Sequence, residues 1–132
     1  MVNIDYIMGL LDWNQSIDDQ NKGISLSREI KCINVFLQPC NEDFGKNVWD
    51  NCAKILSERT DEELSPYLIE LMEWLQDMNW PGAFCILERL HRFADAASFQ
   101  LAYSICTKYA RAIHDDVWEN NLRSIITQNC NH

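Results

Sequence analysis

Acidic and histidine side chains occur at two spacings in this chain that could do chemistry. Glu88 and His91 form an E-x-x-H pair, the spacing used by helical bundles that bind two metal ions, and His114 precedes Asp115 and Asp116. A bundle site needs a second such pair, and the sequence contains no other E-x-x-H. We therefore interpret the first pair as part of a solvated helix face. We interpret the second cluster as a helix end followed by a helix start.

Two short acidic runs, residues 18–19 and 61–63, could supply carboxylates to a metal-dependent nuclease. A nuclease would combine several carboxylates with a lysine around two metal ions, and no motif here indicates that arrangement. Thr60 and Glu63 have the spacing of a capping box, which predicts a short helical turn instead. We predict no catalytic residue, metal ligand or cofactor. The sequence leaves open a convergence of carboxylates from different helices.

Two successive predicted helices, residues 80–93 and 95–113, carry the one group of basic residues that could face a phosphate. This predicted phosphate-facing strip consists of Arg89, Arg92, Lys108 and Arg111. It would form only if the two helices are antiparallel neighbours. In an acidic protein such charges usually pair with nearby carboxylates. A nucleic-acid-processing or metal-dependent accessory role, which would use this strip or an acidic cluster, is an alternative hypothesis.

The composition indicates one globular domain, residues 1–132, with an acidic surface. Twenty acidic and 11 basic residues give a net charge of -9, while 47% of the residues are hydrophobic. This charge repels phosphate backbones, so we expect no nucleic-acid binding, and it favours a basic protein partner. The candidate contact residues are Glu70, Glu73 and Asp77. A homodimeric structural scaffold is a further alternative.

The location we predict is the cytoplasm. The chain opens M-V-N-I-D without an apolar signal segment, and no apolar run is long enough to span a membrane. Six cysteines occur without a C-x-x-C pair. We expect them to be reduced and mostly buried, since Cys on an apolar helix face behaves as a small hydrophobic residue.

Apolar periodicity predicts an all-α fold of about seven helices. Their expected ranges are 4–13, 26–37, 48–59, 65–77, 80–93, 95–113 and 117–128. Residues 14–23 and 41–46 are polar, which is typical of connections. With only four Gly and three Pro, the chain lacks the turn residues that an all-β fold needs.

The segment W-L-Q-D-M-N-W-P, residues 74–81, predicts a tight joint between two of these helices. The residues that form the predicted joint are Trp74, Asp77, Asn79, Trp80 and Pro81. Asn79 is a suitable N-cap, and proline is tolerated in the first turn of a helix. We therefore expect an antiparallel helix pair, with both tryptophans buried beside the turn.

Three predicted helices share a pattern that begins with tryptophan and continues at i+4 and i+7. The three sets are Trp49, Ala53 and Leu56, then Trp80, Phe84 and Leu87, then Trp118, Leu122 and Ile125. The tryptophans lie 31 and 38 residues apart, close to the period of two-helix solenoid repeats. A single such unit cannot bury its apolar face alone, so the pattern predicts stacked repeats.

The run S-P-Y-L-I-E-L-M-E-W-L-Q-D-M-N-W-P-G-A, residues 65–83, resembles a small family of uncharacterised bacterial proteins. That family carries a W-L-Q-D-x-N-W-P signature within an all-helical, HEAT-like domain, and the resemblance covers roughly residues 65–90. It implies a compact HEAT-like helical repeat. It also implies a role suspected for some members, that of immunity or accessory proteins of bacterial toxin systems. Nucleic-acid processing has been suggested for them from fold similarity. We predict a non-enzymatic protein-binding module of the immunity type, with a basic toxin as partner.

Overall fold

The computed structural model describes residues 3–127, and all regular structure within them is helical. This confirms the predicted all-α class. The α-helices are α1 (Ile4–Leu10), α2 (Ile17–Ser27), α3 (Lys46–Ser57), α4 (Asp61–Leu64), α5 (Leu68–Glu73), α6 (Ala83–His91), α7 (Ala96–Ala112) and α8 (Asp116–Thr127). The short 3₁₀ helices are η1 (Ile33–Phe36), η2 (Ser65–Tyr67) and η3 (Trp74–Gln76). None of the helices in residues 3–127 is long and apolar enough to cross a bilayer.

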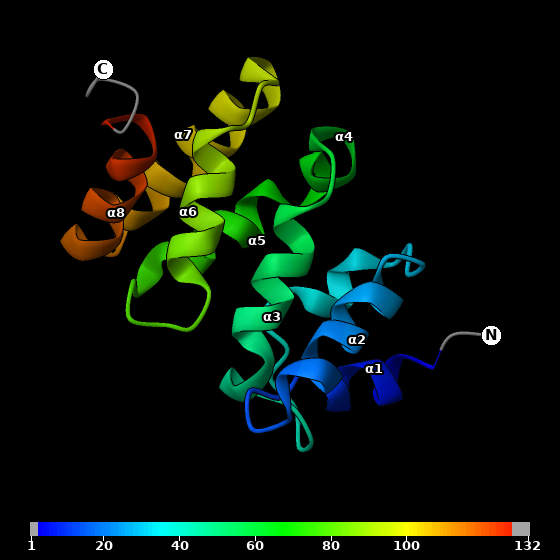
Figure 1. The fold of residues 1–132 in the computed structure, drawn as a ribbon. Coiled ribbons are helices and arrows are strands. Elements are labelled where there is room, and N and C mark those ends of the chain that lie inside the picture. Colours follow the sequence, from blue (N-terminus) through cyan, green and yellow to red (C-terminus); the bar gives the residue numbers. More distant parts are fainter. Residues whose placement is uncertain (1–2, 128–132) are drawn as a thin grey trace.

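Most of the helices pack in two sets, and within each set the helices pack one after another in chain order (Figure 1). In the first set, α3 packs against α6 and α6 packs against α8. In the second set, α5 packs against α7, and α7 also contacts α8. The N-terminal helices α1 and α2 pack together at the opposite end from α7 and α8, where α2 and η1 cover α3. The buried side chains from both ends belong to one hydrophobic cluster.

Three buried tryptophans anchor the core through their indole N–H groups as well as their apolar area. A buried indole needs a hydrogen-bond acceptor, because an unsatisfied polar group inside a protein costs free energy. Each Nε1 donates to a backbone carbonyl of another segment: Trp49 to Pro39 at 2.8 Å, Trp74 to Pro81 at 3.0 Å and Trp118 to Met72 at 3.0 Å. These bonds fix how α3, η3 and α8 sit against their neighbours.

The N-terminal part differs from the sequence prediction. Helix α2 covers most of residues 14–23, where the sequence predicts a polar connection, while the predicted helix 26–37 contains only the end of α2 and η1. The Ser16 hydroxyl caps α2 by accepting from the backbone N–H of Asp19, and acidic residues favour a helix start. A Cβ at Gly23 would lie 2.9 Å from Cβ of Leu10. Gly23 therefore permits close helix packing and does not mark a turn.

Two polar side chains attach this N-terminal segment to the rest of the fold. Asn51 of α3 donates from Nδ2 to the carbonyl of Leu11 at 2.7 Å. Arg59 donates from Nη2 to the carbonyls of Ser27 at 2.8 Å and Ile30 at 2.9 Å. The Ser27 carbonyl also accepts from the backbone N–H of Ile30 at 2.9 Å, so Arg59 adds a second bond there. These two side chains thereby join backbone carbonyls of the N-terminal segment to α3 and the residues that follow it.

The joint between η3 and α6 is longer than predicted. Helix α6 starts at Ala83, its N-cap is Gly82, and Pro81 precedes the helix. Asn79 is not the cap; its backbone N–H donates to the Asp77 carboxylate at 2.8 Å and so stabilises the turn. Gly82 has φ +85°, a left-handed conformation that L residues rarely adopt. The turn therefore ends at the left-handed Gly82, and helix α6 begins at the next residue.

The burial of the two joint tryptophans is confirmed for Trp74 only. Trp74 is fully buried, whereas Trp80 is half-buried at the edge of the core. Trp49 contacts both rings edge-on, at centroid distances of 6.1 Å to Trp74 and 5.7 Å to Trp80. The joint is thus held by an aromatic cluster that includes α3.

The tryptophan pattern is confirmed in α3 and α8, whose predicted sets are buried. It is wrong in α6, because Phe84 is 67% exposed. Helix α6 starts later than predicted, and its buried apolar face consists of Ala83, Ile86, Leu87 and Leu90. The repeat is thus expressed as successive packing of α3, α6 and α8, and the HEAT-like assignment stays a prediction.

Candidate functional site

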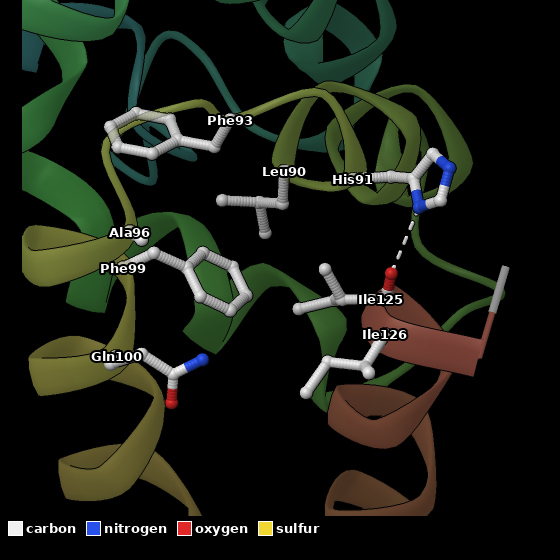
Figure 2. A pocket seen from close by; sticks show the side chains of 8 residues that line it. All are labelled: Leu90, His91, Phe93, Ala96, Phe99, Gln100, Ile125 and Ile126. Carbon is white, nitrogen blue, oxygen red and sulfur yellow. Dashed lines mark hydrogen bonds between the residues drawn. The ribbon is translucent and has the colours of Figure 1, made fainter. Parts of the chain in front are cut away.

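The E-x-x-H pair, Glu88 and His91, lies on α6. Within residues 3–127, no group of three or more His, Cys, Asp or Glu side chains lies close enough to hold a metal ion. Glu88 is exposed, as predicted for a solvated face. His91 is half-buried, and Figure 2 shows its ring pointing to α8, where Nδ1 lies 3.0 Å from the carbonyl oxygen of Ile125. His91 therefore links α6 to α8.

The second cluster is a pair of helix caps, as its sequence predicts. His114 follows α7 with φ +59°, and its backbone N–H donates to the carbonyl of Arg111 at 3.1 Å. The Asp115 carboxylate accepts from the backbone N–H of Trp118 at 2.9 Å. The side chain that caps α8 is thus Asp115.

The acidic run at residues 61–63 has structural roles. Thr60 and Glu63 form the predicted capping box. The Asp61 carboxylate accepts from the guanidinium of Arg89 and, at 2.8 Å, from the backbone N–H of Ala94. Partial burial raises the pKa of Asp61, but the Ala94 N–H and the Arg89 charge outweigh it, so its pKa lies below the ordinary value. The carboxylate is held ionised as a brace between α4 and the α6–α7 connection.

The predicted phosphate-facing strip is not assembled. Arg89 is buried and also donates to the carbonyl of Arg59 at 2.9 Å, while Arg111 pairs with Glu119 of α8 at 2.7 Å. Arg92 and Lys108 are found at the end of α6 and on α7. Helices α6 and α7 each pack against α8.

Five of the six cysteines lie in the described part of the chain, and all five are free. Cys52 and Cys106 are buried, while Cys32 and Cys40 are exposed, so the expectation of mostly buried thiols is only partly met. Burial raises the pKa of Cys106 to about 11 and raises that of Cys52 further. These two thiols are therefore inert in the folded protein. Cys130 lies outside the described residues.

The acidic candidates separate into two groups. Asp77 belongs to the joint, where its carboxylate accepts the Asn79 N–H. Glu70 is exposed and Glu73 half-buried on α5, and neither accepts a hydrogen bond or ion pair from any residue within 3–127. Burial raises the pKa of Glu73, and the neighbouring charge of Glu70 raises it further. These two carboxylates, which repel each other, thus form no ion pair in the described part of the chain.

An apolar hollow of about 250 Å³ lies between η2–α5 and α7, on the same helix as these carboxylates. We call it the α5–α7 groove. Its lining residues are Ser65, Pro66, Leu68, Ile69, Ser98, Leu101, Ala102 and Ile105. Three of the large apolar side chains are exposed, at 37% for Ile69, 67% for Leu101 and 44% for Ile105. Tyr109 continues the row one turn further along α7 and is 55% exposed.

Sequence reasoning missed this groove, although α7 carried a signal for it. On α7, Phe99, Cys106 and Ala110 are buried and Tyr103 is partly buried, so they form its inner face. Leu101 and Ile105 lie off that face at i, i+4 spacing, so α7 has a second apolar row. A second row on a helix that is already packed indicates either another neighbour or a binding surface.

A second hollow, of about 200 Å³, lies among α6, α7 and α8 (Figure 2). Its lining residues are Leu90, His91, Phe93, Ala96, Phe99, Gln100, Ile125 and Ile126. It borders the last described turn of α8. The α5–α7 groove, whose walls are described completely, is the candidate functional site.

The fold and the groove define an all-helical protein with an apolar surface bordered by acidic residues. The chain belongs to a family described as a domain of unknown function, DUF5071, whose model matches residues 45–132. The match confirms the resemblance to an uncharacterised family, and it begins next to the first residue of α3. It includes both walls of the groove and excludes α1, α2 and η1. No curated protein and no solved structure matches the chain.

Proposed function

We propose that this protein is a non-enzymatic binding module that docks a basic protein partner. The observation that supports it is the α5–α7 groove, where exposed apolar side chains lie beside the carboxylates of Glu70 and Glu73. Neither carboxylate forms an ion pair with a residue in 3–127. Exposed apolar surface with a polar rim is typical of protein interaction sites. The net charge of -9 extends the same preference over the whole surface and would speed encounter with a basic partner.

The specific role that we propose is that of a bacterial immunity-type protein in the cytoplasm, which binds and blocks a basic toxin. An acidic surface suits a protein that must capture a basic enzyme quickly, because opposite charges accelerate association. The resemblance of residues 65–90 to proteins suspected of this role supports the same interpretation. Family likeness alone does not establish an activity, so the binding surface is the main support.

The two alternatives have weaker support. Nucleic-acid processing needs a basic surface, but Arg89 is buried against Asp61 and Arg111 is paired with Glu119. A homodimeric scaffold would bring together two chains that each carry a net charge of -9. Self-repulsion of that size opposes dimerisation through an acidic face.

Direct titration with purified components tests the proposal. The chain is purified from its own cells with any bound protein, the co-purifying protein is produced separately, and binding is measured near physiological salt. A duplex DNA and a single-stranded RNA are titrated in parallel. We expect saturable binding of a basic protein that weakens as salt rises, and weak nucleic-acid binding. Tight nucleic-acid binding without a protein partner would overturn the proposal.

A further inference from the structure

Building on the proposed function, we propose that the α5–α7 groove binds an amphipathic helix of the partner. The apolar face of this helix would enter between Ile69 and Leu101, and its lysine or arginine side chains would lie over Glu70 and Glu73. The inference specifies the docking element and its charge, which the proposed function leaves open.

The shape of the groove favours a helix. On α7, Leu101 and Ile105 line the groove. Tyr109, whose ring also packs edge-on against Trp118 of α8, continues this exposed row at i+8, so the row extends about 12 Å at 1.5 Å per residue. A helix that docks in a groove presents apolar anchors over about two turns, which matches this length. Recognition of an extended peptide by strand addition needs a sheet edge, and residues 3–127 contain no strand.

The charge beside the groove favours a basic helix. Glu73 lies four residues after Ile69, so both side chains project on the same face of α5. The carboxylates of Glu70 and Glu73 also act on Cys106 of α7, raising the pKa of its thiol after the larger effect of burial. They therefore border the seam between α5 and α7. A cation bound there would relieve their mutual repulsion and form charge-assisted hydrogen bonds.

A second copy of this chain is a poor occupant of the groove. Its own groove would bring an identical pair of carboxylates to the contact. Like charges opposed across an interface suppress association. The occupant that satisfies both the apolar wall and the acidic rim is a basic amphipathic helix from a different protein.

A designed peptide tests the docking mode without the natural partner. The probe is a fluorescent helix of about 18 residues, roughly five turns, with leucine along one face and lysine elsewhere. A second peptide replaces every lysine with glutamate. Anisotropy titrations up to the order of 1 mM are made at about 0.05 M and 0.5 M salt. We expect the lysine peptide alone to bind saturably, and more weakly at high salt.

Matched variants locate the bound peptide on the protein. Leu101→Ser should weaken binding by about tenfold, because it removes a central apolar contact. Phe84→Ser is the control, since Phe84 on α6 is also 67% exposed, and it should leave binding unchanged. The double variant Glu70→Gln, Glu73→Gln should weaken binding at low salt and flatten its salt dependence. Thermal melts check that all the variants are folded.

The outcomes separate this inference from the proposed function. Absence of saturable binding, equal binding of the glutamate peptide, or equal losses in Leu101→Ser and Phe84→Ser would overturn the docking mode. The proposed function would still stand if a basic protein binds in the direct titration. Tight nucleic-acid binding without a protein partner would overturn both.

Discussion

Replacement of Gly82 by alanine tests the packing of the joint that positions α5 and α6. Gly82 has φ +85° and forms the N-cap of α6. A Cβ at this position would lie 2.6 Å from Cβ of Ala53, 2.9 Å from the carbonyl oxygen of Trp49 and 3.1 Å from the ring of Trp74. Two of these neighbours belong to α3, so the substitution pushes α6 away from α3.

The expected cost has two parts. The left-handed conformation costs an L residue roughly 1–2 kcal/mol. Overpacking in a well-packed core adds typically about 1–3 kcal/mol, and the close contact with the Trp49 carbonyl leaves backbone little freedom to yield. Gly82→Ala should therefore lower the free energy of unfolding by about 2–5 kcal/mol. For a domain of this length, that lowers Tm by roughly 7–18 °C.

Gly9→Ala is the matched control. Gly9 lies inside α1, and a Cβ added there meets no atom within 4 Å. Alanine in a helix interior is more favourable than glycine by about 0.5–1 kcal/mol, so Gly9→Ala should raise Tm by a few degrees. Thermal and urea unfolding followed by circular dichroism measure both variants. If Gly82→Ala melts at or above the temperature of the parent, the described joint is wrong.

Three further predictions concern side chains around the core. Glu73→Gln should raise Tm at neutral pH, because folding raises the pKa of the Glu73 carboxyl and its charge therefore lowers stability above that pKa. The gain in Tm should vanish below about pH 4, where the glutamate is protonated in both the folded and the unfolded state. A difference in Tm that stays the same across this pH range would contradict the raised pKa. Arg89→Met should lower the free energy of unfolding, measured in urea, by about 2–4 kcal/mol, because the Asp61 carboxylate loses its cation. Asp61 is partly exposed, which keeps the cost below that of a fully buried ion pair. A variant as stable as the parent would refute the bracing role of the Arg89–Asp61 pair. The thiols of Cys52 and Cys106 should be alkylated only after unfolding, as read by peptide mass mapping, and rapid labelling of either in the native protein would contradict their burial.

Much of the fold could be predicted from the sequence where local signals and packing agree. The helices around Trp49 and Trp118 follow their apolar periodicity, and the Thr60–Glu63 capping box has the predicted geometry. The N-terminal part could not be predicted, because Gly23 is locally typical of a turn. Its actual role, a close approach to Leu10 and Leu11, depends on tertiary contacts that sequence spacing does not reveal.

The candidate site could be predicted only in part. Net charge and helix position identified Glu70 and Glu73, and the structure leaves both without a cationic partner in the described chain. The groove itself depends on which helices are neighbours, and this is set by the packing of α5 on α7. The same dependence explains the incorrect phosphate-facing strip, since no spacing in the sequence reveals that Arg89 is buried against Asp61.

The most direct test of the central claim is an NMR map of the backbone amides that shift when the lysine–leucine peptide is added. We predict that the largest shifts occur in residues 65–73 and 98–109, which form the walls and the acidic border of the α5–α7 groove. Residues 46–57 of α3, which pack against α6 and the N-terminal helices, should shift little. Shifts concentrated on α3 or α8, with the groove amides unchanged, would show that the peptide does not bind in the groove.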